Sequence, residues 1–216
     1  MSSETTNTNP DYVDIFEARG DLYNEAAEIA PHAREIERQM LIDLLDIQPD
    51  DVVCDAPAGG GYLADSIGAL VADPTQVVCV EPSVTFAQKI DPTFTSHVAP
   101  LDALPLDDGS MDRVGSLAGL HHLRDKATFF AEAFRVLKPG GLVAIADVVV
   151  GTPSAEFLNG AVDRYTSTGH RGEFLNENEC ATLLSAVGFE QVAEEHRKFH
   201  WEFGSMDELV TYCKVL

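Results

Sequence analysis

The sequence predicts an α/β fold, with a mostly parallel sheet that helices cover on both faces. From residue 52 onward, short apolar runs alternate with helical stretches of about ten residues, as in parallel sheets. The first apolar run leads straight into a glycine-rich turn and a helix, a junction typical of open α/β sheets. Two closely spaced runs near the end, Glu190–Glu195 and Lys198–Phe203, predict an antiparallel hairpin at the sheet edge.

The individual elements follow from changes in apolar spacing. Between Asp11 and Asp46 the spacing is helical, with Ile36, Met40 and Leu44 on one face. The elements expected after them are a strand at Val52–Cys54, a helix at Tyr62–Val71, a strand at Gln76–Val80, a helix at Ser83–Ile90, an extended piece at His97–Val98, a strand at Asp112–Leu117, a helix at Lys126–Leu137, a strand at Leu142–Val150 and helices at Glu177–Ala186 and Met206–Val215. No repeat or linker interrupts the 216 residues, so one domain is expected.

Composition limits the partners. Thirty-six acidic against 14 basic residues give a net charge of −22, which repels nucleic-acid backbones and anionic lipid. We therefore predict a small-molecule substrate, no nucleic acid and no membrane partner. The four cysteines form no CxxC pair, and two lie in apolar runs, so we expect reduced thiols, no metal site and a cytoplasmic protein.

The glycine-rich turn is the strongest local signal. Asp55-Ala56-Pro57-Ala58-Gly59-Gly60-Gly61 follows the first strand and enters a helix. Glycine lets the backbone approach a ligand closely, although many such junctions need glycine only to turn.

A carboxylate at the end of the second strand strengthens that signal. Glu81 lies 20 residues after Gly61, with no Lys or Arg beside it. A carboxylate at this position can accept hydrogen bonds from both ribose hydroxyls of an adenosine. Ser83 is expected to cap the helix that follows.

Several stretches, in order, resemble the motifs of class I S-adenosylmethionine-dependent methyltransferases of the type 11-like kind. Asp55–Gly61 resembles the glycine-rich motif of that family. The other similar stretches are Leu104–Asp112 before the fourth strand, Ser116–Leu123 with its LHHL segment, Phe134–Gly141 with its RVLKPGG turn, and the later Phe174–Phe189. No single piece is decisive, but the ordered set is highly specific.

The resemblance implies a Rossmann-like sheet of seven strands that binds S-adenosyl-L-methionine as cofactor. Residues 47–216 would form the cofactor-binding part, and residues 1–46 a helical lid belonging to the same domain. The cofactor-binding residues expected from it are Tyr23, Asp55, Ala56, Pro57, Gly59, Gly61, Glu81, Pro82, Ser83, Leu101, Asp102, Ser116 and Leu117.

Two positions depart from the family pattern. Pro57 replaces the first glycine of the motif, which fixes φ and removes a backbone donor. Pro100 stands where many relatives have an aspartate that binds adenine. Asp102 or the Leu101 backbone is expected to take over that contact.

Three side chains are the candidates for chemistry at the acceptor. His121 follows the fourth strand, and His170 lies on a loop after the fifth, where substrate contacts are usual in the resembling family. Tyr23, on a lid helix, could cover the sulfonium. Packing is the competing interpretation for each of them. The candidate catalytic residues are therefore His170, Tyr23 and His121.

Three functions stay open at this point. The first is methyl transfer to a small metabolite, and the second is a lyase or cyclase reaction within the cofactor that releases methylthioadenosine. The third, a non-catalytic adenosyl-binding module, is disfavoured by the intact set of Gly59, Gly61 and Glu81. The acceptor and the choice between monomer and homodimer are not determined by the sequence.

Overall fold

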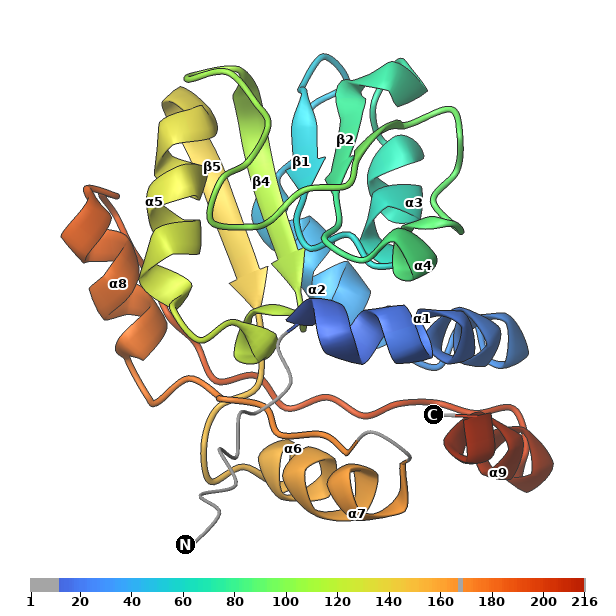
Figure 1. Cartoon of the computed structure of the whole chain (residues 1–216). Helices are drawn as coiled ribbons and strands as arrows, with labels where there is room; N and C mark the ends of the chain where they lie inside the picture. Colours follow the sequence, from blue (N-terminus) through green and yellow to red (C-terminus); the bar gives the residue numbers. More distant parts are fainter. Residues whose placement is uncertain (1–11, 167–168, 216) are drawn as a thin grey trace, which may run out of the picture.

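The computed structural model describes residues 12–166 and 169–215. Within them, five parallel strands form one sheet in the order β3-β2-β1-β4-β5 (Figure 1). The strands are β1 (Val53–Asp55), β2 (Val77–Val80), β3 (Thr95–His97), β4 (Met111–Leu117) and β5 (Leu137–Ala146). In register, Cys54 of β1 lies beside Val78 of β2 and Val114 of β4.

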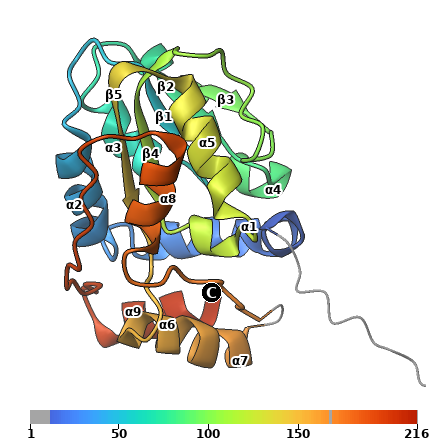
Figure 2. The ribbon, with the colours of Figure 1, turned by 90° about the vertical axis from the view of Figure 1, so that its left-hand side faces the viewer.

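Helices cover both faces of this sheet, as the alternating pattern predicts. Figure 2 shows α2 (Glu35–Leu45) and α3 (Tyr62–Gly68) on one face and α5 (Lys126–Val136) on the other. Helix α8 (Glu179–Val187) packs against α5. Successive residues of β2 divide between the two layers: Val77 and Cys79 pack with α2 and α3, whereas Val78 and Val80 pack toward α5. A strand buried on both sides reads as a continuous apolar run, as observed.

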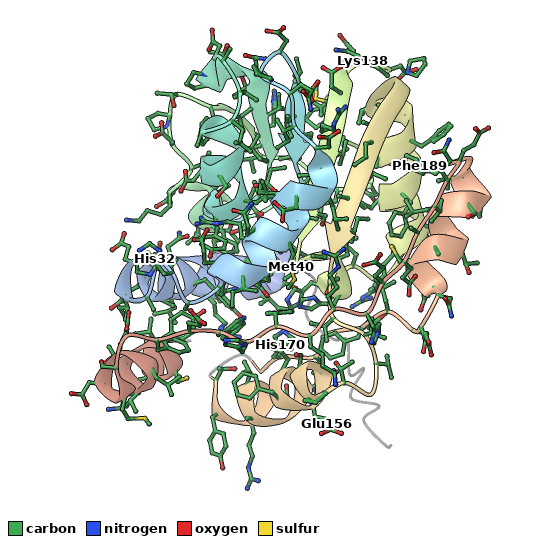
Figure 3. The ribbon with its side chains drawn as sticks, turned by 180° about the vertical axis from the view of Figure 1, so that it is seen from behind. His32, Met40, Lys138, Glu156, His170 and Phe189 are labelled. Atoms are coloured by element: carbon green, nitrogen blue, oxygen red, sulfur yellow. The ribbon has the colours of Figure 1, made fainter. Side chains whose placement is uncertain are left out.

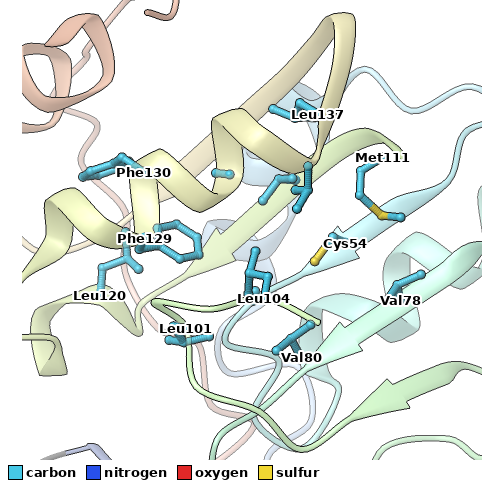
Figure 4. Close-up of a cluster of buried hydrophobic side chains, with 14 of the residues drawn as sticks. Cys54, Val78, Val80, Leu101, Leu104, Met111, Leu120, Phe129, Phe130 and Leu137 are labelled. Atoms are coloured by element: carbon cyan, nitrogen blue, oxygen red, sulfur yellow. The ribbon is translucent and has the colours of Figure 1, made fainter. Parts of the chain in front are cut away.

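The layer between the sheet and α5 holds the larger aromatic side chains (Figure 4). Phe129 and Phe130 are fully buried on α5, in contact with each other at 5.9 Å between ring centroids. Truncating either ring would cost about 3–5 kcal/mol. Cys54 and Cys79 are free and buried in the sheet, as the sequence predicts.

Helix α1 (Tyr12–Ile29) crosses below the carboxyl ends of the strands rather than covering a face of the sheet (Figure 1). It packs against α4 (Val84–Ala87) and against α9 (Met206–Val215). The predicted lid, residues 1–46, therefore comprises α1 and α2, and its first eleven residues lie outside the described part of the chain.

The predicted edge hairpin is wrong, and with it the count of seven strands. Residues 190–203 form no strand, and their apolar side chains serve other contacts. Trp201 and Phe203 pack on Tyr212 of α9, and the Glu202 N–H donates to the Ala33 carbonyl. Because these groups face α9 and the N-terminal helices, they cannot extend the sheet.

The segment after β5 also differs from the prediction. The strand ends at Ala146 rather than Val150, and helical turns follow where a loop was expected. These are α6 (Pro153–Glu156), the turn Phe157–Val162 and α7 (Asp163–Tyr165). Thr152 caps the first of them by accepting from the Ala155 N–H, with proline next to it. Among the described helices, none has the length and hydropathy that a membrane crossing requires.

Candidate active site

Polar groups gather where β1, β2 and β4 end, at the edge that α1 crosses. Asp55 and Ser116 are buried there on neighbouring strands. One oxygen of Asp55 accepts from the Ala64 N–H at 3.0 Å. The other, Oδ1, and the hydroxyl of Ser116 are buried and have no hydrogen-bond partner among the described residues. Unsatisfied buried polar atoms cost about 1–3 kcal/mol each, so this edge fits a ligand with polar groups.

The glycine turn closes over the end of β1. Gly59 and Gly61 have φ values of 55° and 93°, the left-handed region that glycine adopts without strain. A side chain at Gly60 would meet Asn24 of α1, whose Oδ1 lies 2.1 Å from the position of a Cβ. The turn therefore presents bare backbone to its neighbours, as the sequence predicts, and α1 lies directly on it.

Glu81 follows β2 and is fully buried. Its carboxylate accepts hydrogen bonds from the Gly59 N–H at 2.8 Å, the Ser83 N–H at 2.9 Å and the Tyr12 hydroxyl at 2.8 Å. Burial raises the pKa of Glu81 to about 7, and these three hydrogen bonds only partly offset that effect. A group that titrates near neutrality at a sheet edge is a candidate for ligand binding.

Aromatic side chains of α1 and α4 cover this carboxylate. Phe16 stacks on Phe86 at 5.0 Å between ring centroids and meets Tyr23 edge-on at 5.4 Å. Tyr12 packs against Phe16 at 4.6 Å. The structure thus places Tyr12 on Glu81, whereas Tyr23, predicted to cover the sulfonium, packs on Phe16 and Phe86.

A buried arginine connects α1 to the loop after α7. Arg19 is 1% exposed and donates to the Gly169 carbonyl at 3.0 Å. Its guanidinium also lies 5.0 Å from the centre of the Tyr23 ring. Helix α1 of the predicted lid and the loop that carries His170 are therefore in contact.

Three histidines meet below the ends of β4 and β5. His121 and His122 come from the turn η2 (Leu120–His122), and His170 comes from the loop, close to α6 in Figure 3. Asp147, directly after β5, accepts from the Nδ1 of His121 at 2.6 Å and from the backbone of Leu120, His121 and Val148. Asp147 therefore fixes the turn that carries both histidines.

Burial sets the protonation of this cluster. It lowers the pKa of His170 to about 4, helped by the nearby His121. It also lowers the pKa of His122 well below its usual range, for the same reasons. Burial acts to raise the pKa of Asp147, but the His121 ring and the backbone N–H groups outweigh it and lower that pKa. His122 and His170 are consequently neutral at physiological pH.

Comparisons with known proteins show what the chain is similar to. Residues 54–145 match the model of a methyltransferase domain. A probable S-adenosylmethionine-dependent methyltransferase of Mycolicibacterium smegmatis is 33% identical over 138 residues, 64% of this chain and 51% of that protein. Over this stretch the chain is similar to class I S-adenosylmethionine-dependent methyltransferases.

Further relatives support the same family and fold. A ubiquinone/menaquinone biosynthesis C-methyltransferase UbiE of Teredinibacter turnerae is 30% identical, over 69% of this chain and 62% of that protein. The crystal structure of an S-adenosylmethionine-dependent methyltransferase of Thermotoga maritima shares the fold, with a TM-score of 0.68, 22% identity and coverage of 83% and 81%. The chain spans about half the length of the first curated relatives that it matches.

S-adenosylmethionine is the cofactor that these relatives indicate, and the residues present at the sheet edge fit it. The unpartnered Asp55 Oδ1 and Ser116 hydroxyl and the Glu81 carboxylate offer acceptors to an amino acid and a ribose.

The other predicted cofactor residues surround the same edge. Ala56 and Pro57 form the turn after β1, and Ser83 caps α4 as predicted, accepting from the Phe86 N–H at 3.0 Å. Pro82 and Leu117 are half-buried, whereas Leu101 is in the core and Asp102 is exposed. Their contacts with the cofactor remain predictions.

Sequence reasoning did not select four residues that the methyltransferase fold brings to the site. The sequence offered a signal for two of them: Tyr12 lies on the same predicted lid helix as Tyr23, and His122 follows His121 in the LHHL segment. Asn24 and Asn159 carried no signal, because their positions depend on helix packing. The predicted His121 and His170 do lie together, at 5.3 Å between ring centroids.

Proposed function

We propose that this chain transfers a methyl group from S-adenosylmethionine to a small-molecule acceptor. The observation that carries the proposal is the set of buried acceptors around the glycine turn, Asp55 Oδ1, Ser116 Oγ and Glu81, which the chain itself leaves open or incompletely satisfied. A ligand with several donors, such as an adenosyl amino acid, satisfies all three.

Each side chain has a distinct part in binding. S-adenosylmethionine supplies a methyl group that its sulfonium charge already activates. Glu81 accepts from the ribose hydroxyls, and Asp55, held by the Ala64 N–H, offers its free oxygen to the rest of the cofactor. Gly59 and Gly61 leave the backbone of the turn accessible, so that no side chain separates it from the ligand.

The lid function of residues 1–46 rests on the aromatic contacts of α1. Tyr12 and Phe16 lie between the glycine turn and the histidines, with the His122 ring edge-on to Phe16 at 5.0 Å. An apolar cover expels water from the reacting centre and protects the sulfonium from hydrolysis. Arg19 ties the cover to the loop of His170.

The acceptor end is formed by the histidine cluster. His121 and His170 each have Nδ1 engaged, by Asp147 and by Asn159, which leaves their Nε2 atoms for an acceptor. Tyr23, behind Phe16, supports the lid and reaches the acceptor only if the lid rearranges. A small acceptor is favoured because the charge of −22 repels nucleic acid and because a closed lid limits the size of the substrate.

Product analysis tests this proposal directly. The protein is incubated with S-adenosylmethionine, first alone and then with a pool of metabolites, and the adenosyl products are separated chromatographically. Methyl transfer predicts S-adenosylhomocysteine that forms only when the pool is present. Methylthioadenosine formed without any acceptor would instead establish the lyase or cyclase reaction, and no product in either arm would contradict both.

A further inference from the structure

The three histidines below β4 and β5 are arranged like ligands. One ring nitrogen from each of His121, His122 and His170 lies within 4.8 Å of the others. The ring centroids are 4.2 Å apart for the adjacent pair and 5.3 and 5.0 Å from His170. His121 and His170 are almost fully buried, so the cluster is an interior feature rather than a chance meeting on the surface.

The proton on His121 is located by its partner. Nδ1 of this ring lies 2.6 Å from the Asp147 carboxylate, which also accepts from three backbone N–H groups. An ionised carboxylate can only accept, so Nδ1 must donate. The lone pair of the neutral ring is then on Nε2, which is available for another ligand.

The proton on His170 is located in the same way. The Asn159 amide is oriented by Gly172, whose N–H donates to Oδ1 at 2.8 Å and whose carbonyl accepts from Nδ2 at 2.8 Å. The atom of Asn159 that faces Nδ1 of His170, at 3.0 Å, is therefore the oxygen. Nδ1 must donate to it, which again leaves the Nε2 lone pair free.

His122 completes the set with an unsatisfied atom. Its Nδ1 is buried and has no hydrogen-bond partner within the described part of the chain. Tyr12 and Phe16 meet this ring edge-on, at 6.0 and 5.0 Å, and exclude water from one side. A polar atom held in this way is costly unless a ligand satisfies it.

We propose that His121, His122 and His170 bind a divalent transition-metal ion of the Zn²⁺ type. Three imidazoles with one open position form the typical catalytic site, and a carboxylate or amide behind each ring is the usual support. Tetrahedral coordination requires nitrogens about 3.3 Å apart, so the rings need to close by up to about 1.5 Å. The buried Asp147 carboxylate supplies a negative charge beside the ion. The expectation of no metal site rested on the cysteines, and His170 is distant along the chain from the other two histidines.

The site also suggests which class of acceptor would react, and this step of the inference rests on the proposed methyl transfer. Gly119, directly before the histidine turn, faces Pro57 of the glycine-rich turn, so the histidine turn borders the predicted cofactor site. A hydroxyl or thiol held at the open position of the ion would have a lowered pKa and lose its proton to solvent. Its oxygen or sulfur would bond to the methyl carbon, while the carbon–sulfur bond breaks and its electron pair stays on sulfur, giving S-adenosylhomocysteine.

Metal binding by the full-length chain tests the site without any acceptor. After removal of metals with a chelator, Zn²⁺ is titrated calorimetrically and Co²⁺ is followed by its visible absorption. We expect one tight ion per chain and the intense Co²⁺ bands of a tetrahedral site. His170→Ala and His122→Ala should each weaken binding by about 100-fold or more. His200→Ala, an exposed histidine beside Glu202, is the matched control and should change nothing.

The outcomes separate this inference from the proposed function. The metal site would be overturned if no ion binds tightly, or if the wild type and both cluster variants bind the ion equally. Weak binding of several ions would also overturn it, because the acidic surface alone accounts for such binding. Circular dichroism identifies a variant that fails to fold, and His170→Asn then replaces it, since that loop position lies outside the sheet. The affinity for S-adenosylhomocysteine should be equal with and without metal. A protein that binds the metal but not S-adenosylhomocysteine would count against the proposed function and not against the metal site.

Discussion

Two buried carboxylates at the same sheet edge have pKa shifts of opposite sign. Burial raises the pKa of Glu81, at the end of β2, to about 7 in spite of three hydrogen bonds. Burial acts in the same direction on Asp147, at the end of β5, but the His121 ring and the backbone N–H groups bring its pKa below the usual range. Asp147 is therefore satisfied by the protein, whereas Glu81 is held in a state that further donors would stabilise.

The same contrast extends to the two halves of the site. Beside Glu81, Asp55 also has a pKa raised by burial, and one of its oxygens is unpartnered. Beside Asp147, both His121 and the turn that carries it are fixed by hydrogen bonds. The β1–β2 half is thus prepared for a ligand with donors, and the β4–β5 half is built as a rigid support for imidazoles.

Asp147→Ala should have the largest effect, on stability. It removes the buried carboxylate that accepts from the His121 ring and from three backbone N–H groups. Breaking such a buried pair costs about 3–5 kcal/mol. The melting temperature should fall by about 6–20 °C for a chain of this size. Calorimetric melting measures this, with the exposed Asp50→Ala as control, and equal melting temperatures would show that Asp147 is not structural.

Glu81→Ala should weaken cofactor binding by the β1–β2 half of the site. The variant loses the ribose acceptor, and each charged hydrogen bond is worth about 1.5 kcal/mol or more, so cofactor affinity should fall by about 2–4 kcal/mol. Titration calorimetry with S-adenosylhomocysteine measures the loss, and Glu156→Ala, an exposed glutamate on α6, is the control. Unchanged affinity would refute the ribose assignment, whatever happens to activity.

The pH dependence of stability should show the raised pKa of Glu81. Because its folded-state pKa is about 7 against an ordinary value of 4.5, the group favours the folded state below pH 4.5. That contribution is lost as the pH rises through 7, by about 2 kcal/mol between pH 5 and pH 8. Glu81→Gln should remove this part of the slope in urea denaturation, and parallel curves for the two proteins would contradict it.

Gly119→Ala should disturb the contact between the two halves. A Cβ at Gly119 would lie 2.2 Å from Cγ of the Pro57 ring, and the backbone φ of −127° is otherwise suitable for alanine. Overpacking of this kind costs about 1–2 kcal/mol. Gly160→Ala, where a Cβ meets nothing within 4 Å, is the matched control for thermal melting. Equal stability of the two variants would mean that the Pro57 turn moves freely.

The sequence predicted the two halves unequally, for a physical reason. Asp55 and Glu81 were predicted because each follows a predicted strand directly, and Gly59 because it lies in the turn after the first strand. Parallel strands bring their carboxyl ends to one edge. The histidine cluster was found only in part, since the meeting of His170 with His121 depends on helical turns after β5 that the sequence did not reveal.

Packing also decided which lid residues reach the site. The tyrosines at 12 and 23 lie on the same helix, and the helical pattern alone does not determine which one reaches Glu81. The edge hairpin was predicted from apolar residues near the end of the chain, but Trp201 and Phe203 are used to pack α9. Tertiary contacts determine which of these side chains reaches which partner, and the local spacing of apolar residues does not predict those contacts.

Tyr12→Phe should have the smallest effect, and in the favourable direction. The Tyr12 hydroxyl donates to the same Glu81 oxygen as the Gly59 N–H, so it competes with a ribose hydroxyl for that acceptor. Removing it leaves the free protein less satisfied while the ring still packs on Phe16. Affinity for S-adenosylhomocysteine should therefore rise about fivefold, or about 1 kcal/mol. Tyr165→Phe, 79% exposed, is the control. Weaker binding by Tyr12→Phe would show that this hydroxyl contacts the bound cofactor, and that the β1–β2 half is completed by the lid rather than shielded by it.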